Sequence, residues 1–462
     1  MGQKNAIFDA FDAEFDDELA ALDGTGDQGL FPQPPAEDTP PPVDVDAPQK
    51  DASPEDVIFG LDNDEFQERI IPAITIQAFC ETDETRLLIE RAGDDRRLSR
   101  TSLTVQEGGL AAATEYLREN PTPNLLLLES RAPAAQLIAE IDSLAEHCDE
   151  GVEVMVIGAM NDIQLYRQLV ARGVSEYLVP PLQPLQLIKS IGELFADPDQ
   201  PFLGRSIAVV GAKGGVGAST IAHNLAWSLA ENASLNTTLV DLDLSFGTTA
   251  LDFNEENAQT VADALRDPDR ADDAVIGRLM SKFTPRLSLF TAPASLSSHL
   301  DIPTTAYDAV IEGVRRNVPY VVLDLPHLWS DWMETTLLNS NEVIVVCQPD
   351  LASLRNGKNI IDRLKDARPN DAPPKLVMNM AGVPKRPEIP VKDFAAAIGV
   401  EPEIILPFEP QLFGTAANNG QMISETDPNN KASLAVDHLA SVLTGKSVQP
   451  PEKSLIQKLL GK

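Results

Sequence analysis

Residues 206–220 read SIAVVGAKGGVGAST, and this stretch decides the fold of the larger part of the chain. Its apolar start predicts a buried strand, and the run 221–231 after it has a helical pattern. The glycines between them let backbone N–H groups wrap phosphate oxygens, and the helix adds the positive end of its dipole. The stretch therefore predicts a phosphate-binding loop in an α/β domain, which we place at residues 204–445. In such a loop Ser219 would bind magnesium and Thr220 would bond the α-phosphate.

The run Lys213-Gly214-Gly215-Val216-Gly217 resembles the deviant Walker A loop of the MinD/ParA ATPases. The resemblance implies that Lys213 reaches across a dimer interface to the nucleotide of the partner. The residues expected to contact the nucleotide from this loop are Gly214, Gly215, Val216, Gly217, Ala218, Ser219 and Thr220.

Two acidic segments further along match the same family in the expected order. Asp241-Leu242-Asp243 follows the predicted strand 238–240 and resembles switch I, in which Asp243 would orient and activate the attacking water. Asp324 ends the apolar run 320–324 and resembles the Walker B aspartate, which holds magnesium through water.

The late strands complete the resemblance. Runs 343–347 and 376–379 match strands whose ends face adenine in the family, and Asn379 is a candidate contact of the base. Taken together, the motifs imply ATP and Mg as cofactors. The residues expected to hold the metal, partly through water, are Ser219, Asp241 and Asp324.

One departure from the family weakens the expected activity. Ala218 stands where the usual loop has a second lysine, and Ala212 stands where a strict Walker A loop has its first glycine. The missing ammonium lies between the β- and γ-phosphates, and a charge-assisted contact of that kind contributes ~1.5–3 kcal/mol. Its loss predicts roughly ten- to hundredfold weaker affinity or slower turnover, unless Lys213 compensates. We therefore expect ATP binding with slow hydrolysis, or binding alone.

Residues 70–197 predict a second α/β domain, because apolar runs alternate with helical patterns as in a parallel, doubly wound sheet. The fold class is thus α/β, with two doubly wound domains. The expected strands of the first domain are 74–79, 102–105, 124–129, 152–157 and 177–179, and the expected helices are 84–92, 109–119, 133–147, 162–172 and 183–195.

The order of these elements and the segment 173–181 resemble the flavodoxin-type receiver domain of response regulators. The chemistry departs from that pattern: Glu129 replaces the phosphoacceptor aspartate, Glu81 is the one carboxylate of the metal pair, Gly158 replaces a hydroxyl residue and Pro180 replaces a lysine. Without lysine and metal nothing would stabilise an acyl phosphate. We predict a pseudo-receiver used for docking or dimerisation; the alternative is a plain α/β spacer.

The formal net charge of the 462 residues is −35, and it is unevenly spread. Residues 1–68 hold 19 acids, two lysines and eight prolines, which leaves −17 there and −18 on the other 394 residues. Such a segment cannot bury enough apolar surface to offset its chain entropy, so we predict a disordered acidic arm at residues 1–69. Apolar residues recur at helical spacing from Phe8 to Leu22. The arm is therefore either a solvated linker or a segment that folds on a partner.

A receiver-like domain followed by a MinD-like domain with Ala218 in its loop resembles the CpaE/TadZ proteins. These proteins assist the assembly of tad (Flp-type) pili and localise that machinery, often at a cell pole. The resemblance covers residues 70–445. It implies an ATP-dependent homodimer, with the pilus secretion ATPase and polar landmark proteins as partners.

Residues 446–462 are expected to form a linker and a short amphipathic helix at 452–460, with Leu455, Ile456 and Leu459 on one side. This loosely resembles the membrane-targeting tail of MinD and predicts a weak membrane contact through residues 452–462. The alternative is a helix packed on the domain or a frayed terminus.

The apolar runs are far shorter than the ~20 residues that span a bilayer, and the acidic N-terminus does not resemble a secretory signal. We therefore expect a cytoplasmic protein, at the cell pole or on the inner membrane surface. Two other functions stay open. One is a ParA-like ATPase that positions cargo on DNA, although the acidity of the chain disfavours DNA as a partner. The other is a catalytically silent scaffold.

Overall fold

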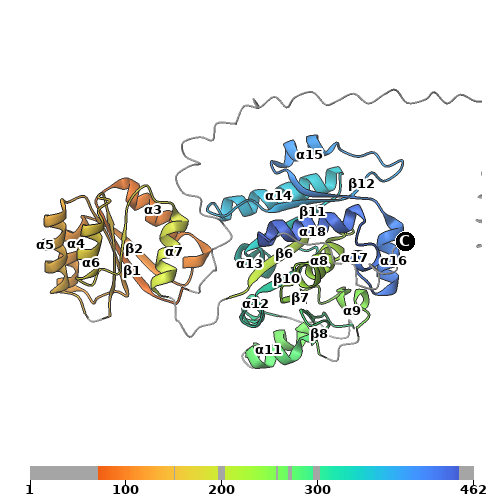
Figure 1. The fold of residues 1–462 in the computed structure, drawn as a ribbon, viewed down its shortest axis with the longest axis horizontal. Coiled ribbons are helices and arrows are strands. Elements are labelled where there is room, and N and C mark those ends of the chain that lie inside the picture. The colour runs from red at the N-terminus through yellow and green to blue at the C-terminus, as the bar shows by residue number, and fades with distance from the viewer. Residues whose placement is uncertain are drawn as a thin grey trace, which may run out of the picture. The chain divides into compact units, whose positions relative to one another are not determined.

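The computed structural model describes residues 71–149, 151–195, 203–255, 259–268, 273–294 and 302–446. The arm predicted at 1–69 and the short helix predicted at 452–460 lie outside these residues. The described residues form two α/β domains (Figure 1), which we call the receiver-like domain (71–195) and the P-loop domain (203–446). Each helix in the described part of the chain is too short or too polar to cross a membrane.

The receiver-like domain is built on a five-stranded parallel sheet in the order β2-β1-β3-β4-β5. The strands are β1 (Thr75–Cys80), β2 (Ser102–Glu107), β3 (Leu125–Ser130), β4 (Glu153–Gly158) and β5 (Glu176–Leu178). The helices are α3 (Asp83–Gly93), the 3-10 turn η2 (Arg96–Leu98), α4 (Gly109–Glu119), α5 (Ala134–Ala145), α6 (Ile163–Val170) and α7 (Pro184–Leu194). The doubly wound parallel sheet predicted from the sequence is confirmed.

Both faces of this sheet are covered, which explains the uninterrupted run of leucines in β3. Leu125 and Leu127 pack in the cluster that includes side chains of α3 and α7. Leu126 and Leu128 pack on the opposite face with α4, α5 and α6. Figure 1 shows these two helical layers on either side of the strands. A strand buried on both faces needs apolar residues at every position rather than at alternate ones.

The P-loop domain contains an eight-stranded sheet in the order β13-β12-β11-β6-β10-β7-β9-β8, parallel except for the β8–β9 pair. Its strands are β6 (Arg205–Gly211), β7 (Thr237–Asp241), β8 (Ser281–Lys282), β9 (Leu287–Phe290), β10 (Tyr320–Asp324), β11 (Glu342–Cys347), β12 (Lys375–Ala381) and β13 (Pro402–Pro407). The predicted doubly wound architecture is confirmed here as well.

Helices cover both faces of this sheet. One layer consists of α8 (Ala218–Trp227), the π-helical turn η3 (Ser228–Asn232), α16 (Pro410–Asn419), α17 (Ile423–Thr426) and α18 (Lys431–Thr444). The other layer consists of α10 (Val261–Arg266), α11 (Asp273–Leu279), α12 (Thr304–Asn317), α13 (Asp331–Asn339), α14 (Leu351–Ala367) and α15 (Val391–Ile398). The short helix α9 (Thr249–Asp252) follows β7.

The strand order indicates where a ligand would bind to the P-loop domain. β6 lies between β10 on one side and β11 on the other, so the chain reverses its direction of progress across the sheet next to β6. Ligands of open α/β sheets bind at such a switch point, outside the carboxyl ends of the strands. The glycine-rich loop leaves β6 at this edge.

Candidate nucleotide-binding site

The loop between β6 and α8 is anchored through its carbonyl groups. Four of them bond side chains that come from outside the loop, at 2.8 to 3.1 Å: Gly211 O to His327 Nδ1, Ala212 O to Asn356 Nδ2, Gly215 O to Gln348 Nε2 and Val216 O to Asn379 Nδ2. The N–H and C=O of one peptide point in opposite directions. The N–H groups of Lys213, Val216 and Gly217 therefore face the other way, next to the N-terminus of α8, which suits an anion. The N–H of Ala212 is already bonded to Val346 O at 2.9 Å.

Glycine is required at Gly217 for two reasons. Its φ of +83° lies in the left-handed region, and a Cβ there would come within 2.6 Å of Asn379 Nδ2. Gly215 has a φ of +77° but open space around it, and Gly214 is exposed. The loop is thus tightly packed where α8 begins and open at its tip.

Lys213 bonds a carboxylate of its own chain. Its Nζ lies 2.7 Å from Asp350 Oδ2, and the two side chains are 32% and 27% exposed. Asp350 also caps α14 by accepting from Ser353 N at 2.8 Å. Burial alone would raise the pKa of Asp350, but Lys213 and Ser353 hold it below its ordinary value. In this structure, therefore, Lys213 is occupied in cis.

Two buried carboxylates lie side by side beyond the loop. Asp241 ends β7 and Asp324 ends β10, and the two are paired neighbours in the sheet. Asp241 accepts from Asp243 N at 3.1 Å and Thr249 N at 3.2 Å, and burial together with Asp324 raises its pKa to about 7. Asp324 is 1% exposed, and neither of its carboxylate oxygens has a hydrogen-bond partner among the described residues. Among the described residues, the lost hydration of Asp324 is offset by one ion pair, with His223 Nε2 at 3.3 Å.

A buried histidine stands next to Asp324. His223, on α8, has Nδ1 at 2.9 Å from Asp252 Oδ2, and Nε2 at 3.0 Å from Thr249 Oγ1 and 3.3 Å from Asp324 Oδ2. Burial alone would lower the pKa of His223, but Asp252 and Asp324 raise it to about 10. The ring is therefore a cation at neutral pH, and it is the positive charge nearest to Asp324 that the structure describes.

The other predicted site residues take the following places. Asp243 is half-buried, and its carboxylate accepts from Phe246 N at 2.9 Å within the turn after β7. Ser219 and Thr220 lie half-buried in the first turn of α8. Asn379 is 4% exposed and uses its amide on Val216 O and on Met380 N, although it also lines the cavity described next.

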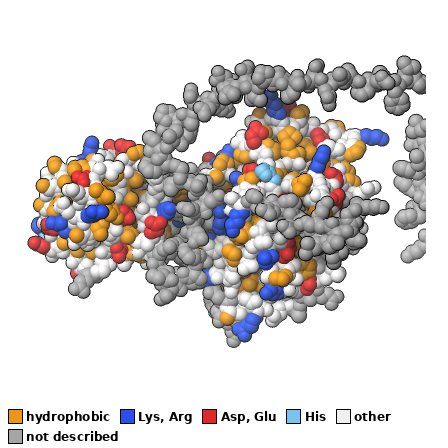
Figure 2. Space-filling view, in the orientation of Figure 1, with side chains coloured by type: hydrophobic (Ala, Val, Ile, Leu, Met, Phe, Trp, Pro, Cys, Tyr) orange, Lys and Arg blue, Asp and Glu red, His pale blue; other side chains and the backbone are white. Residues whose placement is uncertain are grey.

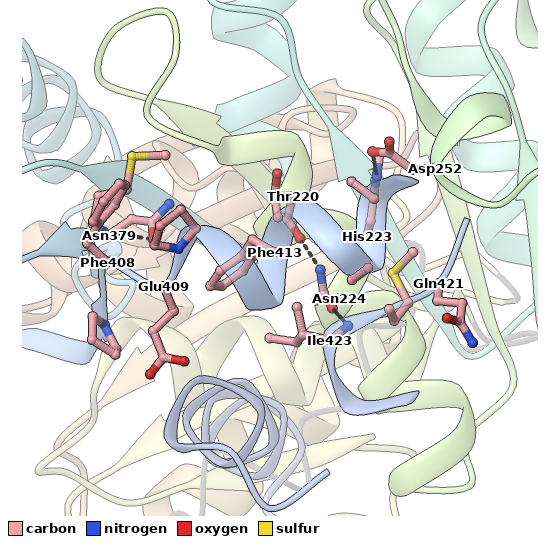
Figure 3. A pocket seen from close by; sticks show the side chains of 16 residues that line it. Thr220, His223, Asn224, Asp252, Asn379, Phe408, Glu409, Phe413, Gln421 and Ile423 are labelled. Carbon is pink, nitrogen blue, oxygen red and sulfur yellow. Dashed lines mark hydrogen bonds and ion pairs between the residues drawn. The ribbon is translucent and has the colours of Figure 1, made fainter. Parts of the chain in front are cut away.

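A cavity of about 200 Å³ is lined by Thr220, His223 and Asn224 of α8 and by residues between 407 and 423. Figure 3 shows His223 and Asp252 at one end of it, Phe413 near the middle, and Asn379, Phe408 and Glu409 at the other end. Its walls combine aromatic and aliphatic side chains with a few polar groups, as small-molecule sites do. The cavity is adjacent to the residue predicted to bond the α-phosphate, so it is suited to a base and its sugar.

At the corresponding edge of the receiver-like domain, the polar side chains already have hydrogen-bond partners within the domain. The carboxylate of Glu129 accepts from four donors at 2.7 to 2.9 Å: Glu81 N, Thr82 N, Thr82 Oγ1 and Thr85 Oγ1. The Tyr177 hydroxyl donates to Met160 O at 2.9 Å, and a Cβ on Gly158 would lie 2.2 Å from that hydroxyl. Gly158 therefore leaves the space that the ring of Tyr177 occupies.

Comparison with known proteins assigns the chain to a family. A pilus assembly protein CpaE from Caulobacter crescentus CB15 is 52% identical over the N-terminal part of the chain; the match covers 28% of this chain and 98% of that one. This chain belongs to the CpaE family. A second CpaE-type protein, from Sinorhizobium meliloti 1021, is 39% identical and is matched over 26% of this chain and 99% of its own. The TM-scores are 0.28 and 0.26, so the assignment rests on sequence identity.

The P-loop domain of this CpaE-family chain has relatives of its own. A family model described as an AAA domain matches residues 204–376. The septum site-determining protein MinD of Synechocystis sp. is 24% identical over 257 residues, which are 53% of this chain and 91% of that protein. The resemblance to MinD that the sequence predicted is thus supported by an independent comparison.

Sequence reasoning missed three features of this CpaE-family site. His223 gave a weak signal: a lone histidine one helical turn after Thr220, on the same side of α8. The pairings of Asp252 and Asp350 could not be read from the sequence, because their partners His223 and Lys213 are brought to them by the fold. In the described residues no cluster of three or more His, Cys, Asp or Glu side chains is arranged to hold a metal on its own.

Proposed function

We propose that this CpaE-family chain is an ATP-binding assembly factor for pilus machinery, with the nucleotide bound at the loop between β6 and α8. One observation carries the proposal. Asp324 is a fully buried carboxylate without a hydrogen-bond partner among the described residues, and it ends the strand next to a loop whose carbonyls are tied back. A bound magnesium ion with its water shell would compensate the charge of Asp324.

The residues present fit Mg. Magnesium prefers oxygen ligands, keeps several waters and usually takes part of its shell from substrate phosphates. Ser219 would supply a hydroxyl, Asp324 would act through water, and Asp241 lies beside it in the sheet. The metal would neutralise charge on the β- and γ-phosphates. The chain itself would hold the phosphates with the loop N–H groups from Gly214 to Thr220.

We expect hydrolysis to be slow. Asp243 is the candidate base: its Oδ1 accepts from Phe246 N, and its Oδ2 would orient the water. Ala218 cannot supply the ammonium that stabilises charge on the phosphates. Lys213 is the remaining candidate, and it is held by Asp350.

A nucleotide-dependent homodimer would place Lys213 at a second site. Large apolar side chains are exposed close in sequence to the residues of the site: Phe246 at 74%, Leu251 at 75%, Trp329 at 51% and Leu351 at 74%. Exposed apolar groups of this size favour a protein interface. In a dimer formed over this face, Lys213 would exchange Asp350 for the phosphates of the partner.

We propose that the receiver-like domain works without phosphorylation. Glu129 already occupies the donors around it, so the loop between β1 and α3 has one stable arrangement. Such a domain suits constant docking, on itself or on the secretion ATPase or polar landmark proteins of a tad-type pilus. Treatment with a phosphoryl donor followed by mass spectrometry should leave Glu129 unlabelled.

Positioning on DNA is the less favoured function. Four of the basic residues that could form a patch on the P-loop domain are paired with nearby acids: Arg316 with Glu312, Arg363 with Glu334, Lys358 with Asp362 and Arg386 with Glu388. Figure 2 shows acidic and basic side chains interspersed on the visible face of this domain. Phosphate binding needs cations that are free to replace counterions.

Binding of labelled ATP to the purified full-length chain, with and without magnesium, tests the proposal. We expect saturable binding that requires magnesium and is weakened by Asp324→Ala, while the exposed Asp366→Ala on α14 leaves it unchanged. Absence of binding at millimolar nucleotide would contradict the ATP-dependent function and favour a silent scaffold.

A further inference from the structure

The His223 ring joins three elements of the P-loop domain. It belongs to α8, its Nδ1 bonds Asp252 on α9, and its Nε2 lies within 3.3 Å of both Thr249 on α9 and Asp324 at the end of β10. The ring is 1% exposed, so solvent does not screen these contacts. A change in the partner of Asp324 therefore changes the contacts of α9 through the side chain of His223.

The segment around α9 makes further contacts with residues of the same site. Thr249 N donates to Asp241 Oδ2 at 3.2 Å, and a Cβ on Gly247 would lie 2.3 Å from that carboxylate, so the backbone passes directly over it. The ring of Phe253 lies 5.7 Å from that of His223. On its outer side the segment exposes Phe246 and Leu251 at 74% and 75%. Residues 244–253 are thus held from within by the site residues.

We propose that His223 is a positioning residue that couples Asp324 to α9, so that loading of the nucleotide site changes the stability of residues 244–253. The inference rests on the proposed nucleotide binding. Without a ligand, the ring divides its attraction between Asp324 and the two α9 side chains. Once Asp324 is engaged by the bound metal, the ring is committed to Asp252 and Thr249. The segment is then held more tightly.

Hydrogen exchange followed by mass spectrometry on the full-length chain tests this coupling. Peptides covering 244–253 are compared without ligand and with magnesium and a non-hydrolysable ATP analogue, each variant being measured at its own saturating concentration. In the unaltered chain we expect exchange in this segment to slow by about threefold or more on loading. In His223→Gln we expect the slowing to be lost at saturating nucleotide, whatever the change in affinity.

Two further variants separate coupling from simple damage. Asp252→Asn changes the residue that His223 Nδ1 bonds. Asp252 is 27% exposed, so it tolerates replacement better than the buried His223 does, and hydrogen exchange in this variant should also not slow on loading. The double variant should lose no more than either single one, since both changes interrupt the same contact. His438→Gln, at an exposed histidine on α18, should respond like the unaltered chain.

The outcomes distinguish the two proposals. If the unaltered chain binds no nucleotide, the proposed function fails and the coupling fails with it. If it binds and residues 244–253 do not respond, or respond equally in His223→Gln, the coupling is overturned while nucleotide binding stands. Slowing that is lost in both single variants and kept in His438→Gln supports it.

Discussion

The two domains place a loop and an acidic residue at the same edge of a parallel sheet and use them in opposite ways. In the receiver-like domain, Glu129 at the end of β3 accepts four hydrogen bonds from the loop after β1 and its helix. In the P-loop domain, Asp324 at the end of β10 has no hydrogen-bond partner among the described residues. At the first edge the acid has a full set of hydrogen bonds, whereas the described contact of the Asp324 carboxylate is one ion pair with His223 at 3.3 Å.

This difference separates a site that has become structural from one that is built for a ligand. A filled set of hydrogen bonds stabilises one conformation and leaves no donor for an added anion. A buried carboxylate without hydrogen bonds costs free energy in the absence of a ligand, and binding recovers part of that cost. The two edges therefore make opposite predictions about what removal of the acid does to stability and to binding.

The largest effect is expected from Glu129→Ala. It leaves four donors without their acceptor, and we expect the receiver-like domain to lose about 3–5 kcal/mol of its free energy of unfolding. Hydrogen exchange of peptides from β1 and α4 reports on this domain within the full chain. The control is Glu84→Ala, an exposed acid in the first turn of α3. Equal protection in the two variants would contradict the structural role of Glu129.

The next effect tests whether the P-loop edge is a weakened binding site. Ala218→Lys restores an ammonium at the end of the loop, and a charge-assisted contact with phosphate contributes ~1.5–3 kcal/mol. We expect ATP to bind roughly ten- to hundredfold more tightly by equilibrium titration. Ala274→Lys adds the same charge at an exposed position on α11 and should change nothing. An unchanged affinity in Ala218→Lys would mean that the loop does not receive the phosphates as proposed.

A third prediction uses the pH dependence of the P-loop domain. The pKa of Asp241 is about 7 in the fold, above its ordinary value of 3.8, because burial and Asp324 disfavour its charge. The folded state thus holds this proton more tightly than the unfolded chain does. The associated stability is present below about pH 4 and is lost as pH rises through about 7.

We therefore expect Asp241→Asn to stabilise the P-loop domain without ligand by about 1–2 kcal/mol at pH 8 and by little at pH 4. Thermal unfolding across this pH range checks the difference. Asp366→Asn, at an exposed residue on α14, serves as the control for loss of one negative charge. A gain that is independent of pH would contradict a raised pKa at Asp241.

The periodic parts of the molecule were predictable, and the long-range contacts were not. Continuous apolar runs predict buried strands such as 206–210 and 125–128, and the spacing of the glycines predicts the phosphate-binding loop. The pair β8–β9 was missed, because two residues in β8 are too few to show a pattern. His223 and Asp350 act through partners far away in the sequence. Sequence also cannot show that the amide of Asn379 bonds the loop carbonyl of Val216.

The smallest effect concerns Lys213, which bonds Asp350 in this structure and would bind the partner's phosphates in the proposed dimer. Asp350→Asn removes the charge that holds Lys213 while an asparagine still caps α14. A partly exposed ion pair contributes ~0.2–1 kcal/mol, so we expect self-association with the ATP analogue to tighten by about two- to fivefold in sedimentation experiments. Asp362→Asn breaks the Lys358 pair on the same helix and should have no such effect. The gain should vanish in Asp350→Asn combined with Lys213→Ala. A gain that persisted without Lys213 would show that Asp350 opposes association by its charge alone, and Lys213 would then have no role at the partner's phosphates.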